Sequence, residues 1–405
     1  MRITSVEPVL LSGPSSNDRW ISVAKRLRTA AFVEVRTDNG LVGVGETYVG
    51  YFAPELVAPV VDYVRPILLA ADEVDVAVLT NRMRRCLGFW ARVGVGSAIL
   101  SGVEAALWDL AGQAAGVPVY ELLGGARHER LRLYATGGPS LLPVDSFRRK
   151  LDRYLELGFT AMKVATGYLD LSRAARSGPA GPEASAQVEV DKLEMMRAHL
   201  GPDVGIALDG HMGHRDGVDR WDGPTAAAAL HALAPYDLLF FEEPLAYDDP
   251  EEYAQLRAES TVPIAGGEQL TSAEEFRLWT YRGAFDIVQP DAAWLGLSDF
   301  MTVGVRAAAD GAGIASHSWS AGGGVMQNLH AAFACSATVI VEGIPDPGEL
   351  HTRLWGDNFV VEDGHVLPPQ APGLGVQLSD ETKNRFPFVA GVEEFSSVPG
   401  KVLAS

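Results

Sequence analysis

The chain has 405 residues, of which 47% are hydrophobic and 21% charged, and its formal net charge is −19. This composition can bury a large core, excludes a disordered chain, and is long enough for two domains. The acidic charge argues against binding to nucleic acid or an anionic membrane, since phosphate repels it, and no run of about 18 apolar residues predicts a membrane span.

The first residues and the cysteines bear on the compartment. The opening MRITSVEPVLLSG has no long apolar run after a basic start, so no signal peptide is predicted. Cys86 and Cys335 alone cannot build a disulfide framework. We therefore expect a soluble, reduced, cytoplasmic protein, for which an enzyme is the simplest function.

Residues 1–127 differ from the rest of the chain and are predicted to form an α+β module. Residues 31–37 and 41–46 read as strands, and the DNG turn at 38–40 is typical of a hairpin. Residues 98–115 carry apolar side chains at helical spacing. Strands followed by helices in one segment favour this class of module.

From about residue 128 to 345, short apolar runs alternate with helical stretches. Eight strand candidates begin near residues 131, 161, 204, 238, 262, 285, 312 and 338. This alternation favours a closed (β/α)₈ barrel, with an open doubly wound sheet as the alternative. Residues 168–182 form a long loop after the second strand, either a lid or a disordered insertion. Residues 346–405, rich in Gly and Pro, are expected to fold back on the first module.

Polar residues end six of the predicted strands at intervals of 33, 26, 23, 26 and 25 residues. They are Asp209, Glu242, Glu268, Asp291, His317 and Glu342. Any one of them alone could be a solvated loop residue. An interval close to one strand–helix unit predicts instead that all six line the mouth of the barrel, where such barrels carry their active sites.

The types of these residues indicate metal and acid–base chemistry. Asp209, Glu242 and Glu268 would repel one another unless a cation lay between them, and oxygen ligands favour Mg²⁺. Glu243 competes with Glu242 on spacing alone. Asp291 beside His317 suits a general base, although a buried structural pair is the alternative.

Two further residues near strand ends are candidates. Lys163 ends the second strand and could neutralise a substrate carboxylate, although a lysine can end a strand by chance. His211 follows Asp209 by two residues and could be a metal ligand or a general acid. His214, further into the same loop, is expected to be solvated.

These residues carry a resemblance to a known family. The stretch SGVEAALWDLAGQAAGVPVYELLGG at 101–125, followed by Asp209 and the motifs EEP, GGE, QPD and SH, resembles the enolase superfamily and, within it, the mandelate racemase group. The similarity covers essentially the whole chain. It implies a capping domain formed by residues 1–127 and the tail at 346–405, above a barrel at 128–345.

The resemblance also implies roles for the candidate residues. Asp209, Glu242 (rather than Glu243) and Glu268 would bind Mg²⁺. His317, paired with Asp291, would be the base on one face of the substrate. Glu342 would hydrogen-bond the substrate carboxylate and stabilise an enediolate as an electrophile.

The chain departs from the family pattern at one informative position. Lys163 matches the first lysine of the Lys-x-Lys strand motif, but the second position is Ala165, so a base on the opposite face is missing. Asp209-Gly210-His211 is similar to the Asp-x-His of galactonate and mannonate dehydratases. The lone lysine and the ATG after the first strand are similar to rhamnonate dehydratases.

We therefore expect a Mg²⁺-dependent dehydratase of a sugar acid, with His317 as base and with either His211 or His317 itself as acid for the leaving hydroxyl. An epimerase, racemase or cycloisomerase is the alternative, with a second base from Tyr168 or the long loop. A binding barrel without activity and a metal-dependent hydrolase are weaker alternatives. A small-molecule substrate and a homo-oligomer are expected by resemblance.

Aromatic residues are the candidates for the substrate pocket. By resemblance, two loops of the cap close over the mouth, and they contain Trp20, Tyr48 and Tyr51. Trp319, just after His317, could line the same pocket. Simple packing is the alternative for each of these side chains.

Overall fold

The structure, a computed structural model, describes residues 1–14, 16–17, 27–138, 140–168, 181–215 and 220–391. Its strands are β1 (Ile3–Pro14), β2 (Leu27–Thr37), β3 (Val42–Thr47), β4 (Leu131–Thr136), β5 (Ala161–Ala165), β6 (Gly205–Asp209), β7 (Phe241–Glu242), β8 (Ile264–Gly266), β9 (Ile287–Val288), β10 (Gly313–Ser316), β11 (Thr338–Gly343), β12 (Val361–Glu362) and β13 (His365–Val366). Its α-helices are α1 (Val49–Phe52), α2 (Val57–Leu69), α3 (Val76–Leu87), α4 (Val95–Ala115), α5 (Val119–Leu122), α6 (Val144–Glu156), α7 (Pro182–Leu200), α8 (Gly223–Leu233), α9 (Pro250–Glu259), α10 (Ala273–Tyr281), α11 (Ala292–Leu295), α12 (Leu297–Asp310), α13 (Gly322–Ala334), α14 (Glu349–Trp355) and α15 (Asp380–Arg385).

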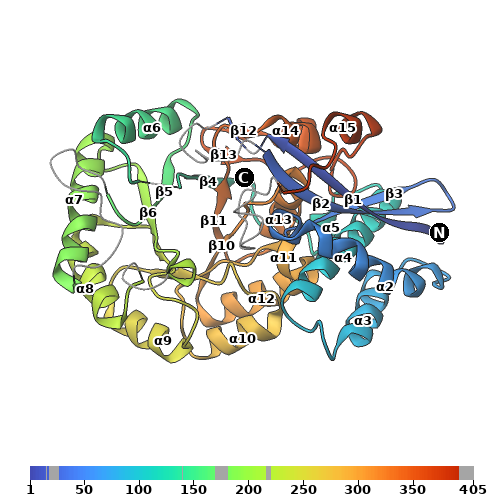
Figure 1. Cartoon of the computed structure of the whole chain (residues 1–405), viewed down its shortest axis with the longest axis horizontal. Helices are drawn as coiled ribbons and strands as arrows, with labels where there is room; N and C mark the ends of the chain where they lie inside the picture. The colour runs from blue at the N-terminus through green and yellow to red at the C-terminus, as the bar shows by residue number, and fades with distance from the viewer. Residues whose placement is uncertain (15, 18–26, 139, 169–180, 216–219, 392–405) are drawn as a thin grey trace.

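The strands form two sheets. β4 to β11 are parallel neighbours in chain order, and β11 pairs with β4, with Val341 opposite Leu133, so the sheet closes into an eight-stranded barrel. β1, β2 and β3 form a separate antiparallel sheet at the N-terminal end. The predicted barrel with an N-terminal capping domain is therefore confirmed, and the open doubly wound sheet is excluded. Helices α6 to α10 wrap one side of the barrel, and the cap lies on the other (Figure 1).

The barrel interior explains why the strand ends carry the chemistry. A layer of buried side chains fills it: Tyr134, Ala161, Ala207, Phe240, Ala265, Ala315 and Ile340. Side chains alternate along a strand, so the residue two positions later also faces inward. That next layer contains Lys163, Asp209, Glu242, His317 and Glu342. The apolar layer thus forms a floor beneath a polar mouth.

The cap contains the predicted hairpin and one strand that was not predicted. β2 and β3 pair as expected, and β1 adds to β2, with Val6 opposite Val35. Helix α4 lies close against β3, because a Cβ on Gly43 would come 2.1 Å from the carbonyl oxygen of Ala106. Only glycine permits this approach.

The C-terminal segment returns to the cap, as predicted. Leu378 and Phe386 are buried in one apolar cluster with Leu11, Phe32 and Val44 of the cap sheet. The short strand β13 pairs with β4 on the barrel. The tail therefore contacts both parts of the chain.

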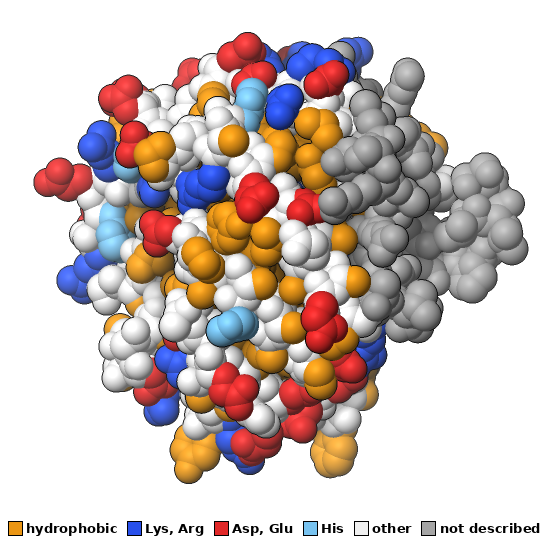
Figure 2. All heavy atoms as spheres, turned by 90° about the vertical axis from the view of Figure 1, so that its left-hand side faces the viewer, with side chains coloured by type: hydrophobic (Ala, Val, Ile, Leu, Met, Phe, Trp, Pro, Cys, Tyr) orange, Lys and Arg blue, Asp and Glu red, His pale blue; other side chains and the backbone are white. Residues whose placement is uncertain are grey.

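The long loop predicted at 168–182 falls mostly outside the described residues, as does Trp20. On the face in Figure 2, acidic side chains lie among basic and apolar ones rather than in a field of one sign. Within the part of the chain that the structure describes, no helix is both long and apolar enough to cross a membrane.

Candidate active site at the barrel mouth

Lys163 is the centre of a buried charge cluster at the mouth. Its Nζ lies 3.0 Å from Asp209 Oδ2, 2.7 Å from Glu242 Oε2 and 3.5 Å from Glu342 Oε1. Burial lowers the pKa of Lys163, but the surrounding carboxylates outweigh it and hold that pKa well above its usual range. Lys163 is therefore a fixed cation among carboxylates from three strands.

The negative charge of an ionised Glu242 is only partly neutralised by the side chains around it. Its Oε2 accepts hydrogen bonds from Lys163 and from Gln289 Nε2, the latter at 2.6 Å. Its buried Oε1 has no hydrogen-bond partner among the described residues. Burial and the neighbouring Asp209 raise the pKa of Glu242 to about 8, against the lowering effect of Lys163. An ionised Glu242 therefore calls for a further cation.

Glu243, the competing residue, points elsewhere. Its backbone is left-handed, with φ of 43°, and its carboxylate accepts a hydrogen bond from Gln269 Nε2 at 3.0 Å. Burial, and then the nearby Glu268, raise the pKa of Glu243 well above its usual range. Glu242, which shares Lys163 with Asp209, is thus the better placed of the two to act with Asp209.

His317 and Asp291 form a buried pair. His317 Nδ1 lies 2.7 Å from Asp291 Oδ2, and Asp291 Oδ1 accepts hydrogen bonds from the Ala293 N–H and from Asn328 Nδ2. Since Asp291 faces Nδ1, the free nitrogen is Nε2, which lies 3.7 Å from Glu268 Oε2. The orientation of the imidazole is fixed as a general base requires.

The charge state of His317 depends on the carboxylates around it. Burial lowers the pKa of His317, but Glu268, Glu342 and Asp291 outweigh it and raise that pKa to about 10. A general base must be neutral at its working pH. A cation that offsets Glu268 would bring the pKa of His317 down toward that range.

Glu342 is an ionised acceptor here. Its Oε1 accepts from Thr136 Oγ1, and its Oε2 accepts from the Ser318 N–H at 2.5 Å. Burial raises the pKa of Glu342, but Lys163 and His317 outweigh it and lower that pKa. To act as an electrophile, as the resemblance implies, this carboxyl would have to carry a proton.

His211 lies at the rim beside Asp209. Its Nδ1 is 3.0 Å from Asp209 Oδ1, and its side chain is 44% exposed. Its backbone is left-handed, with φ of 46°, so its own N–H also reaches Asp209 Oδ1, at 3.1 Å. Burial lowers the pKa of His211, but Asp209 outweighs it and raises that pKa to about 10. Beside Asp209, the imidazole of His211 therefore favours its protonated form.

An aromatic wall from the cap borders His317. The Tyr48 ring centroid lies 5.4 Å from that of His317 and 5.2 Å from that of Tyr51. Trp319 Nε1 donates to Tyr51 Oη at 3.2 Å. Trp294, which no sequence motif singles out, joins this wall with its ring centroid 5.6 Å from that of Tyr48. The three described pocket candidates, Tyr48, Tyr51 and Trp319, thus form one surface near His317.

The side of the mouth near β5 holds no second lysine at position 165. Lys192 on α7 reaches this side of the barrel, but it donates to the Ala165 carbonyl at 2.8 Å and forms an ion pair with Glu189. Tyr168, considered as a second base, is buried in the apolar core, with its ring 6.3 Å from Phe147.

The described donor atoms at the mouth are those that a hard metal ion prefers, although they do not form a complete ligand group. Among the residues that the structure describes, no three His, Cys, Asp or Glu side chains are placed as a ready-made ligand group, and Lys163 lies between Asp209 and Glu242. The donor chemistry nevertheless fits a hard divalent cation, because the candidates offer only oxygen and Glu242 Oε1 is buried without a partner.

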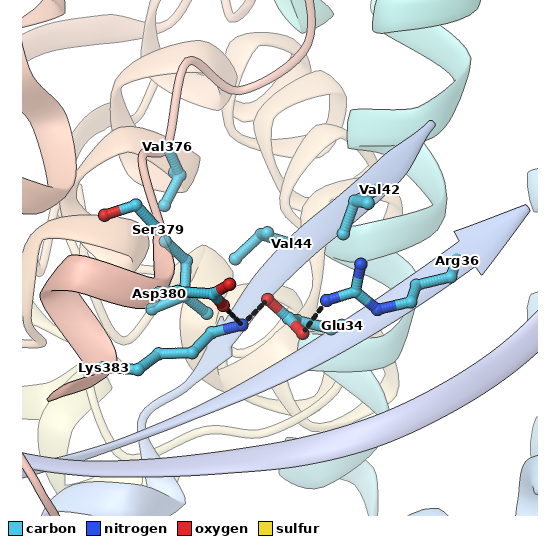
Figure 3. Close-up of a pocket in the computed structure, with 9 residues that line it drawn as sticks. Glu34, Arg36, Val42, Val44, Val376, Ser379, Asp380 and Lys383 are labelled. Atoms are coloured by element: carbon cyan, nitrogen blue, oxygen red, sulfur yellow. Dashed lines mark hydrogen bonds and ion pairs between the residues drawn. The ribbon is translucent and has the colours of Figure 1, made fainter. Parts of the chain in front are cut away.

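A hollow of about 350 Å³ lies between the cap sheet and the tail. Its charges pair with one another: Lys383 Nζ is 2.5 Å from Glu34 Oε1, and Arg36 is 2.9 Å from Glu34 Oε2 (Figure 3). The paired charges make this hollow a structural junction, so the barrel mouth is the candidate active site.

The fold and the mouth define a class: a capped (β/α)₈-barrel enzyme with carboxylates and a histidine–aspartate pair at the strand ends. Residues 146–382 match the family described as enolase C-terminal domain-like, and residues 21–124 match the mandelate racemase/muconate lactonizing enzyme N-terminal domain. The chain therefore belongs to the mandelate racemase group of the enolase superfamily, as the resemblance implied.

Named relatives narrow the chemistry. The chain is 30% identical to an arabinonate dehydratase of Saccharolobus solfataricus, over 86% of this chain and 87% of that protein. It is 31% identical to a 3,6-anhydro-alpha-L-galactonate cycloisomerase of Streptomyces coelicolor, over 87% and 90% of the two chains. A crystal structure of a racemase from Streptomyces coelicolor with bound magnesium is similar, with TM-score 0.79 and 28% identity, over 95% and 99%.

Proposed function

We propose that the protein is a Mg²⁺-dependent dehydratase of a sugar acid, an aldonate or an aldarate. The product is a 2-keto-3-deoxy acid. The observation that carries this proposal is the pairing of two histidines of different type at one mouth. His317 is oriented by Asp291 as a base, and His211 lies at the rim with its Nδ1 3.0 Å from Asp209 Oδ1, while position 165 offers no base for the opposite face.

Asp209, Glu242 and Glu268 would hold the metal, and Lys163 would contact the substrate carboxylate. When bound, Mg²⁺ supplies positive charge that stabilises the enediolate, the type of electrostatic effect that contributes most in such reactions. The same positive charge would offset the carboxylates that raise the pKa of His317. The magnesium-bound racemase relative supports this choice of metal.

The proton transfers can be written from the residues of this chain. His317 Nε2 takes the proton from C2, and the electron pair moves into the enediolate. The C3–O bond then breaks, and His211 gives its proton to the departing hydroxyl, which leaves as water. The resulting enol takes up a proton at C3 to become the keto acid. His317 returns its proton to solvent and His211 regains one.

The decisive variant is His317→Asn, which keeps the polar contact to Asp291 but removes the base. A general base contributes about 10²- to 10⁴-fold, so C2 hydrogen exchange in deuterated water should fall by that factor. A panel of five- and six-carbon mono- and diacids with Mg²⁺, read by the semicarbazide reaction of keto acids, identifies the substrate. Undiminished exchange in a folded His317→Asn protein would remove His317 as the base.

The second candidate is cycloisomerisation, which the 31% identical relative favours. It would start with the same enediolate but would retain the elements of water. Product mass separates the two: a dehydratase product is lighter than its substrate by one water, and an isomerase product is not. An unchanged mass with every converted acid would replace the first proposal by the second.

A further inference from the structure

The cap residue Glu46, on β3, is buried against the segment that follows His317. Its Oε1 accepts the Ala321 N–H and its Oε2 accepts the Gly324 N–H, both at 2.7 Å. These amides belong to the first turn of α13 and to the residue before it. A carboxylate in this place satisfies N–H groups that lack partners within the helix and complements the helix dipole.

The fit between Glu46 and α13 needs small residues at the contact. A Cβ on Gly324 would come 1.9 Å from Ser320 Oγ, and one on Gly323 would come 3.0 Å from Glu46 Oε2. The backbone of Glu46 is also fixed, because its N–H donates to Gln327 Oε1 at 2.7 Å and its carbonyl accepts from Gln327 Nε2 at 3.1 Å. Glu46 and α13 are thus joined by side chain and backbone together.

A second cap residue, Arg28 on β2, holds the same segment from its other end. Its Nη1 donates to the carbonyl oxygens of Trp319 and Ser320, at 2.7 and 3.0 Å. The guanidinium also lies 4.9 Å from the ring centroids of Tyr51 and Trp319. Residues 318–324, which follow His317 directly, are therefore held between the buried side chains of Glu46 and Arg28 of the cap.

Helix α13 also reaches the partner of His317. Asn328 Nδ2 donates to Asp291 Oδ1 at 2.7 Å, and Asn328 Oδ1 accepts the Ala292 N–H at 2.7 Å. Asn328 directly follows Gln327, whose side chain hydrogen-bonds the backbone of Glu46. One helix thus connects the cap to both members of the His317–Asp291 pair.

We propose that Glu46 is a positioning residue: through α13 it sets the orientation of the His317–Asp291 pair for proton abstraction. Arg28 acts on the same segment from the carbonyl side. The inference rests on the proposed function for its kinetic readout, but not for its spectroscopic one. The magnesium ligands proposed above lie on β6, β7 and after β8, outside the segment that Glu46 holds, so substrate binding and proton transfer should separate.

The first test compares Glu46→Gln with Glu34→Gln. Both residues are buried cap glutamates, at 2% and 5% exposure, but Glu34 faces the tail. The Gln side chain has the same size as Glu but only one acceptor oxygen. Its amide NH₂ would therefore face one of the two backbone N–H groups that Glu46 accepts. We expect kcat and C2 exchange to fall about 10- to 100-fold, as for a misplacement of about 1 Å, with KM within about twofold. Glu34→Gln should keep kcat within about twofold.

The second readout needs no substrate. The proton in the His317–Asp291 hydrogen bond should give a downfield ¹H NMR signal, assigned by its loss in His317→Asn. We expect this signal to shift or broaden in Glu46→Gln and to stay in Glu34→Gln. If Glu46→Gln unfolds, Gly323→Ala perturbs the same contact from the helix side. An unmoved signal with wild-type kcat in either folded variant would overturn the inference.

Failure of the two proposals can be told apart. If no sugar acid reacts with the wild-type protein, the proposed function fails, and the NMR comparison still decides the role of Glu46. If the wild type dehydrates a sugar acid but Glu46→Gln does so at the wild-type rate, only the positioning role fails. A loss of thermal stability in both variants with unchanged kcat would mark Glu46 as purely structural.

Discussion

The barrel mouth and the junction between cap and tail both bring acidic and basic side chains together, but they balance them differently. At the junction, Glu34 and Asp380 face Arg36 and Lys383, and the charges are matched. At the mouth, the single ammonium of Lys163 meets carboxylates from three strands, and Glu242 keeps one oxygen without a partner among the described residues.

The matched charges of the junction stabilise the fold, whereas the unmatched carboxylates of the mouth leave room for a bound cation. Matched pairs at a partly exposed site lower the free energy of the folded chain modestly. Unmatched buried carboxylates raise it, as the pKa of about 8 at Glu242 indicates. The mouth should therefore lose function without losing stability when an acid is neutralised, and the junction should do the opposite.

The largest expected effect comes from Glu242→Gln. Because a metal contributes several kcal/mol to stabilising charge in the transition state, kcat/KM should fall about 10³-fold or more. The metal-free protein should keep its free energy of unfolding at pH 7 within about 1 kcal/mol, since Gln resembles the protonated carboxyl that a pKa of about 8 favours. Steady-state kinetics and urea unfolding in EDTA measure both.

Stabilisation of the fold by Mg²⁺ tests whether Glu242 binds the metal, with Glu34→Gln as the matched control variant. At a concentration of 100 times its Kd, Mg²⁺ should stabilise the wild type by about 2.7 kcal/mol, and Glu242→Gln should lose most of that gain. Glu34→Gln should retain it. Equal stabilisation of all three proteins would place the metal away from Glu242 and would break the contrast between the two regions.

An intermediate effect is expected where the tail meets α13 through an uncharged contact. His330 accepts the Tyr120 N–H at Nδ1, lies 3.3 Å from the Leu374 carbonyl through Nε2, and is fully buried. Burial lowers the pKa of His330 from 6.5 to about 4. Its contribution to stability is therefore complete above pH 6.5 and is lost as the pH falls through 4, by about 3 kcal/mol in all.

His330→Gln preserves an acceptor and a donor but cannot take up the proton. Urea unfolding at pH 7.5 and 4.5 should show a smaller loss of stability on acidification in this variant than in the wild type. His231→Gln, an exposed position on α8, should behave as the wild type. The same acid sensitivity in His330→Gln would show that the uncharged tail contact does not limit stability at low pH.

The sequence predicts the barrel and its mouth well, because both follow from patterns that recur along the chain: side chains alternate within each strand, and strand–helix units repeat. Eight strand starts fell within about three residues of β4 to β11, and the residues at their ends follow from alternation along each strand. The strand β1 was missed because Pro8 interrupts its pattern. Pro8 is tolerated there since β1 is the edge of its sheet.

The supporting contacts of the site were not predictable in the same way. Gln289 and Asn328 act on Glu242 and Asp291 across 47 and 37 residues of sequence, and only the packed fold brings them together. Gln289 left a faint signal, as it precedes Asp291 by two residues on the inward-facing side. Asn328 gave no such signal, because an Asn in a predicted helix is ordinarily expected on the solvent-exposed face.

The smallest expected effect is at the junction, in Lys383→Met. The methionine keeps the apolar stem but removes the ammonium, which lies 2.5 Å from Glu34 Oε1 and 3.6 Å from Asp380 Oδ1. The lysine side chain is 21% exposed, so the loss should be about 1 kcal/mol at low salt and less in 1 M salt, where the pair is screened. Thermal unfolding at both salt concentrations measures this loss of stability, and kcat is measured on the same variant. Since the junction's ion pairs link the cap sheet to the tail and include no residue of the mouth, kcat should not change. A parallel fall in kcat would show that the tail acts on the mouth through the cap and would make one coupled system of the two regions.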